Sequence, residues 1–373
     1  EDPCECFKIK GGNTLNPAET VLNMKMHKAI SIIQFKLEGQ LLIRRKEFHM
    51  ADRALLDDIN YEDGTIRLYG KEYNLLDHAF PTVDPENPYE LSKEEEEVME
   101  RLVSAFANCE KLQRHMQLLL KKGSLYKVYN NNLLYHGCVP LNDDGSFKEV
   151  EIYGRTYKGR ELYDVLESYV RKAFFALDKE EKQRGRDILW FIWSSPASPL
   201  FGKDKMATFE RYFLAEKETH VEKKNSYYRL LEDENVVDNI FREFGIEGDC
   251  CHIINGHVPV HHTSGESPIK CGGKVLVIDG GFSKAYQKET GIAGYTLIYN
   301  SWGMILAAHE PFTSAEDAIT RESDILSDSI LVKRTSLRKT VGDTDNGHHL
   351  QESIDELKQL LKAYRNGQII EKE

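Results

Sequence analysis

Two histidines in similar local sequences are the residues best suited to chemistry. His136 follows the apolar run Leu133–Tyr135, and His257 follows the apolar run His252–Ile254 and an Asn-Gly pair. Each histidine is followed within four residues by a proline. A histidine held at the end of a buried strand has little freedom to swing, as a metal ligand requires. The 121 positions between them (257 minus 136) therefore predict one site assembled from distant segments.

The alternative for each histidine is a buried imidazole whose nitrogens bond to the backbone. Spacing alone favours that alternative for either residue taken singly, and the shared strand-histidine-turn context shifts the interpretation toward metal ligands. Divalent cations commonly combine imidazole with carboxylate or amide oxygens. A second apolar strand, Lys274–Ile278, ends in Asp279 and the pair Gly280-Gly281, close behind His257. His261 and His262 lie in a polar loop, where we expect them to be exposed.

Composition and charge limit the function classes. The chain has 373 residues, of which 40% are hydrophobic and 29% are charged, as is usual for a soluble globular protein. A net charge of -12 argues against nucleic acid as a partner, and no apolar run is long enough for a membrane span. Seven cysteines, with Cys250 and Cys251 adjacent, predict a reduced, cytoplasmic protein.

The stretch from Leu189 to Lys205 has an unusual composition. Aromatic residues are followed by a Ser/Pro loop and then by two lysines, Lys203 and Lys205. One interpretation is a core strand followed by an exposed loop, which composition alone favours. The other is a substrate loop with aromatic walls and a basic tip.

Helix signals mark the two ends and the middle of the chain. Asn16-Pro17 predicts a helix start, and Ser92 with Glu95 forms a capping box that predicts one long helix. Asn300–Gly303 predicts a hairpin, and Asn366-Gly367 predicts the end of a C-terminal helix. The apolar residues expected to face inward are Leu22, Met26, Ile30, Ile33 and Leu37 in the first helix, and Val98, Leu102, Phe106, Met116 and Leu119 in the second.

The histidine segments and three longer strings resemble a known family. Tyr135–Pro140 and Ile254–Val260 are similar to the last two metal-ligand segments of the calcineurin-like metallophosphoesterases. Within that superfamily, Ser198–Phe213, Lys217–Asn225, Val277–Tyr299 and Met26–Gly39 resemble the class III fructose-1,6-bisphosphatases of bacteria.

The family's amino-terminal metal motifs are absent from this sequence. Asp77 and His78 are adjacent rather than separated by one residue, and Gly12-Asn13 is followed by threonine. The chain therefore resembles the carboxy-terminal portion of the enzyme, and we expect a fragment that is inactive alone. The segments expected are a helical part (1–130), the first histidine segment (131–150), a helical insertion with the substrate loop (151–248), and a second sheet with the second histidine segment and a C-terminal helix (249–373).

The resemblance implies an α/β fold, as part of a four-layer α/β/β/α sandwich with a largely helical insertion. It implies a phosphoric monoester hydrolase that converts fructose 1,6-bisphosphate to fructose 6-phosphate in gluconeogenesis. Two Mn²⁺ ions would activate the attacking water, with His136 and His257 as ligands. The general acid would lie in the missing motifs, so no catalytic residue is assigned here. Lys203, Lys205 and Arg211 are candidates for the phosphate that is not cleaved.

Other functions stay open at this point. One is another metallophosphoesterase, such as a protein phosphatase or a nucleotide hydrolase. Another is a non-catalytic regulatory or binding polypeptide. The expected partner is a small sugar bisphosphate rather than nucleic acid or a membrane, and the sequence leaves a homo-oligomer open.

Overall fold

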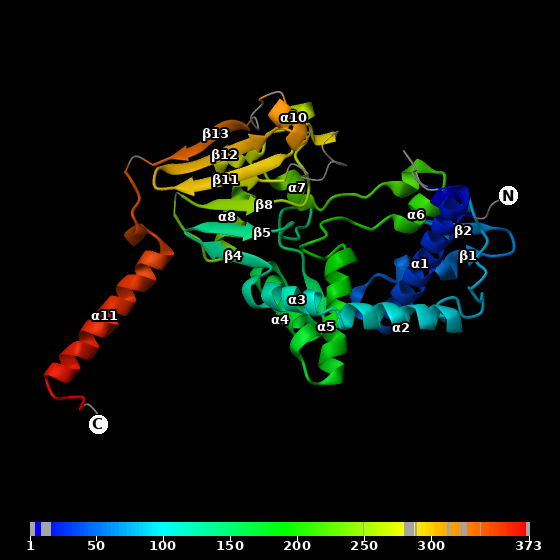
Figure 1. Ribbon diagram of the computed structural model, residues 1–373, viewed down its shortest axis with the longest axis horizontal. Coiled ribbons are helices and arrows are strands. Elements are labelled where there is room, and N and C mark those ends of the chain that lie inside the picture. Colours follow the sequence, from blue (N-terminus) through cyan, green and yellow to red (C-terminus); the bar gives the residue numbers. More distant parts are fainter. Residues whose placement is uncertain are drawn as a thin grey trace. The chain divides into compact units, whose positions relative to one another are not determined.

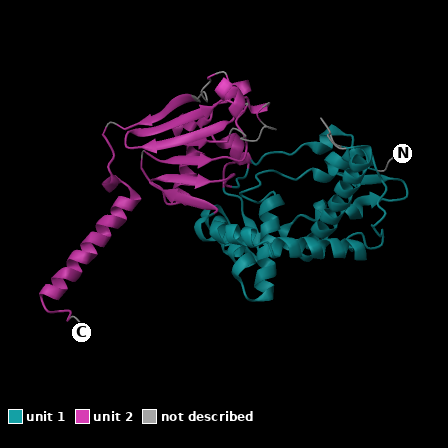
Figure 2. Cartoon of the chain, in the orientation of Figure 1, with its two compact units in different colours: residues 1–124, 140–142, 147–225 teal, residues 125–139, 143–146, 226–373 magenta. Residues whose placement is uncertain are grey.

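The computed structural model describes residues 4–8, 16–248, 250–279, 287, 289–311, 314–320, 322, 327–335 and 337–370. The predicted segments Gly280–Ser283 and Gly12-Asn13 lie outside these residues. The chain forms two compact units (Figure 2). Unit 1 comprises residues 1–124, 140–142 and 147–225, and unit 2 comprises residues 125–139, 143–146 and 226–373. The predicted insertion 151–248 is thus divided between the units.

Unit 1 is mostly helical (Figure 1). Its helices are α1 (Pro17–Arg44), α2 (Lys93–Ala107), α3 (Glu110–Lys122), α4 (Gly159–Phe175), α5 (Lys179–Ser194) and α6 (Thr208–Phe213). Its strands are β1 (Ile59–Asn60), β2 (Thr65–Leu68), β3 (Lys71–Asn74), β6 (Val150–Ile152) and β7 (Arg155–Tyr157). The first three strands form an antiparallel sheet inside the segment predicted to be helical, and the other two form a hairpin.

Helix α1 begins where the sequence predicts but buries a different face. Asn16 and Glu19 form a capping box with Pro17 at the first helical position. The predicted inward residues Leu22, Met26 and Ile30 are exposed, whereas Lys28 and Lys36 are buried. Each buried lysine pairs with a buried carboxylate, Lys28 with Asp77 at 2.6 Å and Lys36 with Glu95 at 2.7 Å. A hydrophobic pattern does not reveal such pairs, and this explains the error.

The helix predicted after Ser92 is two helices. The Ser92–Glu95 capping box is present, but α2 ends at Ala107 and α3 begins at Glu110. Four of the five residues predicted to face inward are exposed, namely Val98, Leu102, Phe106 and Leu119. Glu95, in the first turn of α2, is buried against Lys36.

The aromatic run from Leu189 to Trp193 is the end of α5, so the predicted core strand is wrong. Asp178 caps the helix by accepting a hydrogen bond from the backbone N–H of Glu181. Ile188, Phe191 and Ile192 are buried at helical spacing, and a short apolar run does not by itself distinguish a strand from a helix. The loop that follows is not exposed either, because Ser195 and Ser198 are fully buried.

Unit 2 contains a five-stranded sheet in the order β4-β5-β8-β10-β9. Its strands are β4 (Tyr126–Tyr129), β5 (Asn132–Tyr135), β8 (His252–Asn255), β9 (Ile269–Lys270) and β10 (Val275–Val277). The three central strands are parallel, with Leu133 opposite Ile253 and Ile253 opposite Val275. The two outer strands are antiparallel to their neighbours.

A second sheet packs on the first. Its strands, in the order β11-β12-β13, are β11 (Gly294–Asn300), β12 (Gly303–His309) and β13 (Ser327–Arg334). The predicted hairpin at Asn300–Gly303 is confirmed. Ile254 and Leu276 of the first sheet share a hydrophobic core with Met304 of the second. The protein is therefore a mixed α/β protein in which two sheets share one interior.

The remaining helices of unit 2 are α7 (Ser226–Leu230), α8 (Glu234–Glu243), α10 (Ala315–Thr320) and α11 (Asp345–Arg365). Helix α8 lies against the five-stranded sheet, where Lys274 pairs with Asp238 at 2.6 Å. The predicted C-terminal helix is confirmed and ends before Asn366 and Gly367. No helix in the described part of the chain is both long enough and apolar enough to span a membrane.

Candidate functional site

The carboxyl ends of the three parallel strands of unit 2 bring distant polar residues to one edge. His136 follows β5, His257 follows β8, and Asp279 comes two residues after β10. Ligands of open α/β sheets bind outside the carboxyl ends of the strands. This edge is therefore the place in unit 2 where a site is expected.

Two hydrogen bonds join the turns that carry the histidines. The backbone N–H of Gly256 donates to the backbone oxygen of His136 at 2.9 Å. The side-chain amide of Asn255 donates to the backbone oxygen of Gly137, also at 2.9 Å. Asn255 is buried, so this bond is protected from competing water. The two turns are held as one piece.

The rings of His136 and His257 meet. Nε2 of His136 lies 3.0 Å from Nδ1 of His257, and the ring centroids are 4.9 Å apart. His136 is exposed and His257 is partly exposed, so neither is a core histidine. The structure thus brings together the two residues predicted to share a cation.

His257 occupies an unusual backbone conformation. Its φ is +69°, and the N–H of Val258 bonds to the oxygen of Gly256 at 2.8 Å, as in a γ-turn with positive φ. Residues other than glycine adopt this region at a cost, and such strain gathers at functional sites. The turn fixes the direction in which His257 leaves the sheet.

The histidine pair has the spacing of two ligands on one ion. Two nitrogens that each lie about 2.1 Å from a cation, at about a right angle, are about 3.0 Å apart. The observed separation of 3.0 Å is that of a hydrogen bond between the two rings, and it is also compatible with this value. In the described residues no three or more His, Cys, Asp or Glu side chains gather as a complete ligand set. The chemistry of the pair therefore fits part of a metal site.

Asp279 lies beside Gly256, the residue that precedes His257. Its Oδ2 is 3.7 Å from the position that a Cβ on Gly256 would occupy, and its backbone oxygen accepts a hydrogen bond from Val260 at 2.8 Å. The carboxylate is thus beside the residue that precedes His257. The position of Asp279 directly after an apolar strand is the feature of the sequence that indicates this residue as a candidate.

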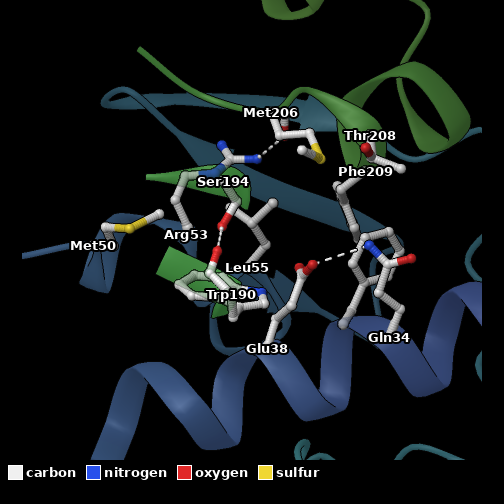
Figure 3. A pocket seen from close by; sticks show the side chains of 11 residues that line it. Gln34, Glu38, Met50, Arg53, Leu55, Trp190, Ser194, Met206, Thr208 and Phe209 are labelled. Atoms are coloured by element: carbon white, nitrogen blue, oxygen red, sulfur yellow. Dashed lines mark hydrogen bonds between the residues drawn. The ribbon is translucent and has the colours of Figure 1, made fainter. Parts of the chain in front are cut away.

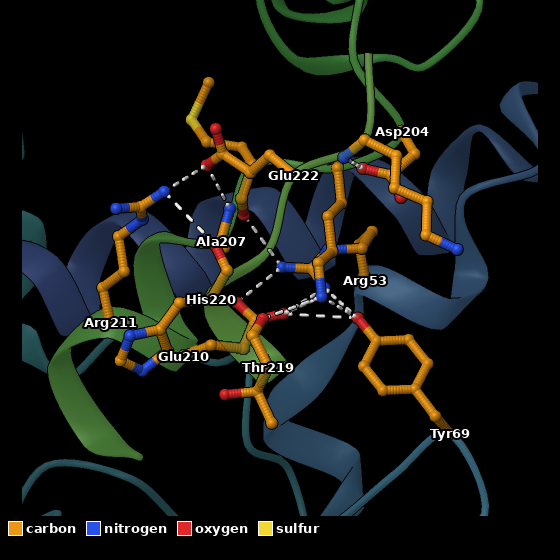
Figure 4. Close-up of polar contacts among 12 residues, drawn as sticks. Arg53, Tyr69, Asp204, Ala207, Glu210, Arg211, Thr219, His220 and Glu222 are labelled. Atoms are coloured by element: carbon orange, nitrogen blue, oxygen red, sulfur yellow. Dashed lines mark hydrogen bonds and ion pairs between the residues drawn. The ribbon is translucent and has the colours of Figure 1, made fainter. Parts of the chain in front are cut away.

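The basic residues predicted to hold a phosphate belong to a network in unit 1 (Figure 4). Lys203 pairs with Glu222 at 2.8 Å, and Arg211 approaches the same carboxylate at 3.5 Å. Lys205 donates to the hydroxyl of Tyr69 at 2.7 Å and to the backbone oxygen of Thr219 at 2.8 Å. All three predicted cations therefore converge on one region.

Two members of this network, Arg53 and Glu210, could not be predicted from a sequence motif. Arg53 binds Glu210 through both carboxylate oxygens, at 2.7 and 3.1 Å, and Glu210 is fully buried. They are 157 positions apart, so local spacing does not connect them. Arg53 also donates to the backbone oxygen of Met206 at 2.9 Å, which anchors the loop that carries the two lysines.

The carboxylate of Glu222 remains charged in this setting. Burial by itself raises its pKa, but hydrogen bonds from Lys203 and from the backbone N–H of Ala207 outweigh burial. The pKa of Glu222 therefore lies below its ordinary value. At neutral pH the cations of the loop are partly neutralised, and an arriving anion would compete with Glu222 for them.

Comparison with known proteins decides the family. The family model of the Firmicute fructose-1,6-bisphosphatases matches residues 1–366. The chain belongs to this family.

Relatives named fructose-1,6-bisphosphatase class 3 agree with the match. The protein of Clostridioides difficile is 56% identical over 373 residues, which are 100% of this chain and 56% of that protein. The Listeria innocua protein is 53% identical over 99% of this chain and 57% of its own length. A Clostridium botulinum protein is 55% identical over 100% and 56%. The chain thus spans about half the length of the curated relatives that it matches. No solved structure matches it.

A small cavity with both apolar and polar lining lies beside Arg53 (Figure 3). Its volume is about 30 Å³, and Glu38 of α1 and Trp190 of α5 line it. Burial raises the pKa of Glu38, which accepts a hydrogen bond of 3.0 Å from Gln34. This volume holds one or two waters and is too small for a sugar phosphate.

A larger hollow of about 820 Å³ lies between α1 and the start of α2. Ile32, Ile33, Phe80 and Val98 make much of its wall apolar. Lys28 and Glu95 also line it, but each is engaged in a buried ion pair. An apolar wall with paired charges does not suit a sugar carrying two phosphates.

Proposed function

We propose that the protein is a metal-dependent phosphatase that removes the 1-phosphate of fructose 1,6-bisphosphate and releases fructose 6-phosphate and phosphate. Membership of the fructose-1,6-bisphosphatase family supports the reaction. The observation that carries the metal assignment is the contact of His136 with His257 at the carboxyl edge of the sheet. The proposal includes Mn²⁺ as the metal, a place in gluconeogenesis, and a cytoplasmic location.

The two imidazoles supply neutral nitrogen ligands. Nε2 of His136 and Nδ1 of His257 face each other and are the atoms that would take a shared cation. Bound cations would lower the pKa of the attacking water and neutralise charge on the transferred phosphoryl group. The bond from Asn255 to Gly137 keeps both rings in place before any ion arrives, and this reduces the ordering needed on binding.

The basic loop would hold the phosphate that is not cleaved. Lys203 and Arg211 share one carboxylate, Glu222, and a phosphate carries enough charge to replace it. Lys205 is held by Tyr69 and Thr219, so its ammonium has a defined position. Loss of Lys203 or Arg211 should then raise KM for the bisphosphate far more than it lowers kcat.

The proposed architecture is the four-layer α/β/β/α sandwich of the metallophosphoesterases. Two facing sheets with a shared core, and α8 against one of them, support it. In this architecture the histidine pair stands at the edge of the sheets, where a substrate has access from solvent.

The test is phosphate release from fructose 1,6-bisphosphate with Mn²⁺ and after a chelator. In a longer protein that carries this chain, activity should require Mn²⁺, and His136→Ala or His257→Ala should lower both activity and bound manganese at least about tenfold. The 373-residue chain alone should release no phosphate, as its sequence leads us to expect. His261→Ala and His262→Ala are matched controls, because both histidines are exposed loop residues outside the pair. Unchanged manganese content in His136→Ala and His257→Ala would reject the metal assignment.

A second function is binding of the bisphosphate without hydrolysis. The described residues gather two imidazoles but no larger ligand set, and this observation favours it. Calorimetry with fructose 1,6-bisphosphate separates the two functions. Binding with no phosphate release at saturating Mn²⁺ would support the second function for this chain, and phosphate release would reject it.

A further inference from the structure

Helix α11 is a long helix with no covered face. All residues from His348 to Lys362 are exposed, and Gly347 is its one buried residue. Its described links to unit 2 include reciprocal hydrogen bonds between Asn130 and Asp345, at 2.8 and 2.9 Å, at its first turn. Most of the stability of a helix in a protein comes from packing of its apolar face, and α11 has no such packing in the described chain.

The exposed apolar residues of α11 form one continuous seam. Leu350, Ile354, Leu357, Leu361 and Tyr364 follow each other at intervals of four, three, four and three residues. Each is between 45% and 64% exposed. Alternation of three and four is the heptad pattern by which two helices pack along each other. The seam therefore fits a second helix of the same kind rather than a flat surface.

Charge is unevenly distributed along α11. Its first two thirds carry Glu352, Asp355 and Glu356, and its last part carries Lys358, Lys362 and Arg365. Side by side in the same direction, two copies would place like charges at the same height. In opposite directions, the acidic part of one copy lies beside the basic part of the other, and the two helix dipoles oppose each other.

We propose that α11 is a dimerisation element that pairs antiparallel with α11 of a second copy of this chain. In the register that brings the acidic part of one copy beside the basic part of the other, Leu357 packs on the partner's Leu361 and Ile354 packs on the partner's Tyr364. Leu360, on the flank of the seam, lies next to the partner's Leu360 at the twofold axis.

The first experiment measures association by light scattering and sedimentation over a dilution series. Leu357→Asp should raise the dimer dissociation constant about a hundredfold or more, because two apolar contacts per dimer are lost. Gln359→Asp adds the same charge on the opposite, exposed side of the helix and should leave the constant within about threefold. A wild-type chain that is monomeric throughout, or a dimer unaffected by Leu357→Asp, overturns the proposal.

The second experiment tests direction by disulfide cross-linking. The exposed cysteines Cys109 and Cys250 are first replaced by serine. Leu360→Cys should then form a linked dimer under mild oxidation. Leu350→Cys should not, because residue 350 of one copy lies about 27 Å along the helix from residue 350 of the other. Faster linking of Leu350→Cys indicates a parallel pair and overturns the antiparallel arrangement.

Discussion

The side-chain amide of Asn255 donates a hydrogen bond of 2.9 Å to the backbone oxygen of Gly137. The bond ties the turn of His136 to the strand that leads to His257, and Asn255 itself is buried. In the described part of the chain, Oδ1 of Asn255 is buried and has no hydrogen-bond partner.

Replacing Asn255 should therefore destabilise unit 2. Asn255→Ala leaves the oxygen of Gly137 without its donor, and we expect a loss of about 1–2 kcal/mol in the free energy of unfolding. Asn255→Asp should cost more, because a buried carboxylate would face a carbonyl oxygen. Urea titration measures the free energy of unfolding of both variants. Asn23→Ala, at an exposed position of α1, is the control. An Asp variant as stable as wild type would show that the donor is unimportant.

The positive φ of His257 leads to a second prediction. His257→Gly should be more stable than His257→Ala by about 1 kcal/mol, since only glycine adopts this region without strain. Both variants lack the imidazole, so the comparison isolates the backbone. Equal urea midpoints for the two variants would mean that the turn relaxes when the ring is removed.

A third prediction concerns the buried ion pair of Lys36 and Glu95. Lys36→Met leaves the Glu95 carboxylate buried without its cation and should cost about 3–5 kcal/mol. Lys36→Met with Glu95→Gln removes both charges and should recover part of that loss. Thermal unfolding of the single and double variants checks this. Additive losses would contradict direct coupling of the two side chains.

A fourth prediction concerns the stability of the protein at acidic pH. Burial, together with the positive charges of Lys333 and Lys339, lowers the pKa of His252 to about 4. The unfolded chain, with a histidine pKa of about 6.5, binds this proton first, so stability should fall as the pH drops from about 6.5 to 4. This loss is absent at neutral pH and should reach about 1 to 3 kcal/mol by about pH 4. His252→Gln should flatten the dependence in a pH series of urea midpoints, whereas His261→Gln should not. An unchanged slope in His252→Gln would assign the acid effect to other groups.

The histidine pair could be predicted from sequence because its signal is local. Each histidine ends an apolar run, and parallel pairing of β5 with β8 brings the ends of both runs to one edge. The hydrogen bond between Asn255 and Gly137 follows from that register, but no spacing rule reveals it in advance.

The basic network could be predicted only in part. Charge identifies Lys203, Lys205 and Arg211, but the carboxylates that hold them become visible only when α6 folds against distant segments. Glu210 and Arg53 illustrate this, because they are separated by 157 positions and buried together.

The core of unit 1 was harder to predict for the same reason. Lys28 and Lys36 read as solvent residues in any hydrophobic pattern, yet their pairing with Asp77 and Glu95 places them inside. The buried face of α1 therefore includes Ile33 of the predicted stripe but leaves Leu22, Met26 and Ile30 exposed. In α5, Trp193 and Leu189 remain exposed, so its aromatic run is half surface and half interior.

Pairing of β5 with β8 has a consequence for the order of folding. Asn132 lies opposite His252, and 120 positions separate them (252 minus 132). Closing so long a loop is slow and comes late. During synthesis on the ribosome, more than a hundred further residues must be added after His136 before β8 can pair with β5. The sheet edge that carries the histidine pair should thus be among the last parts of a newly made molecule to mature.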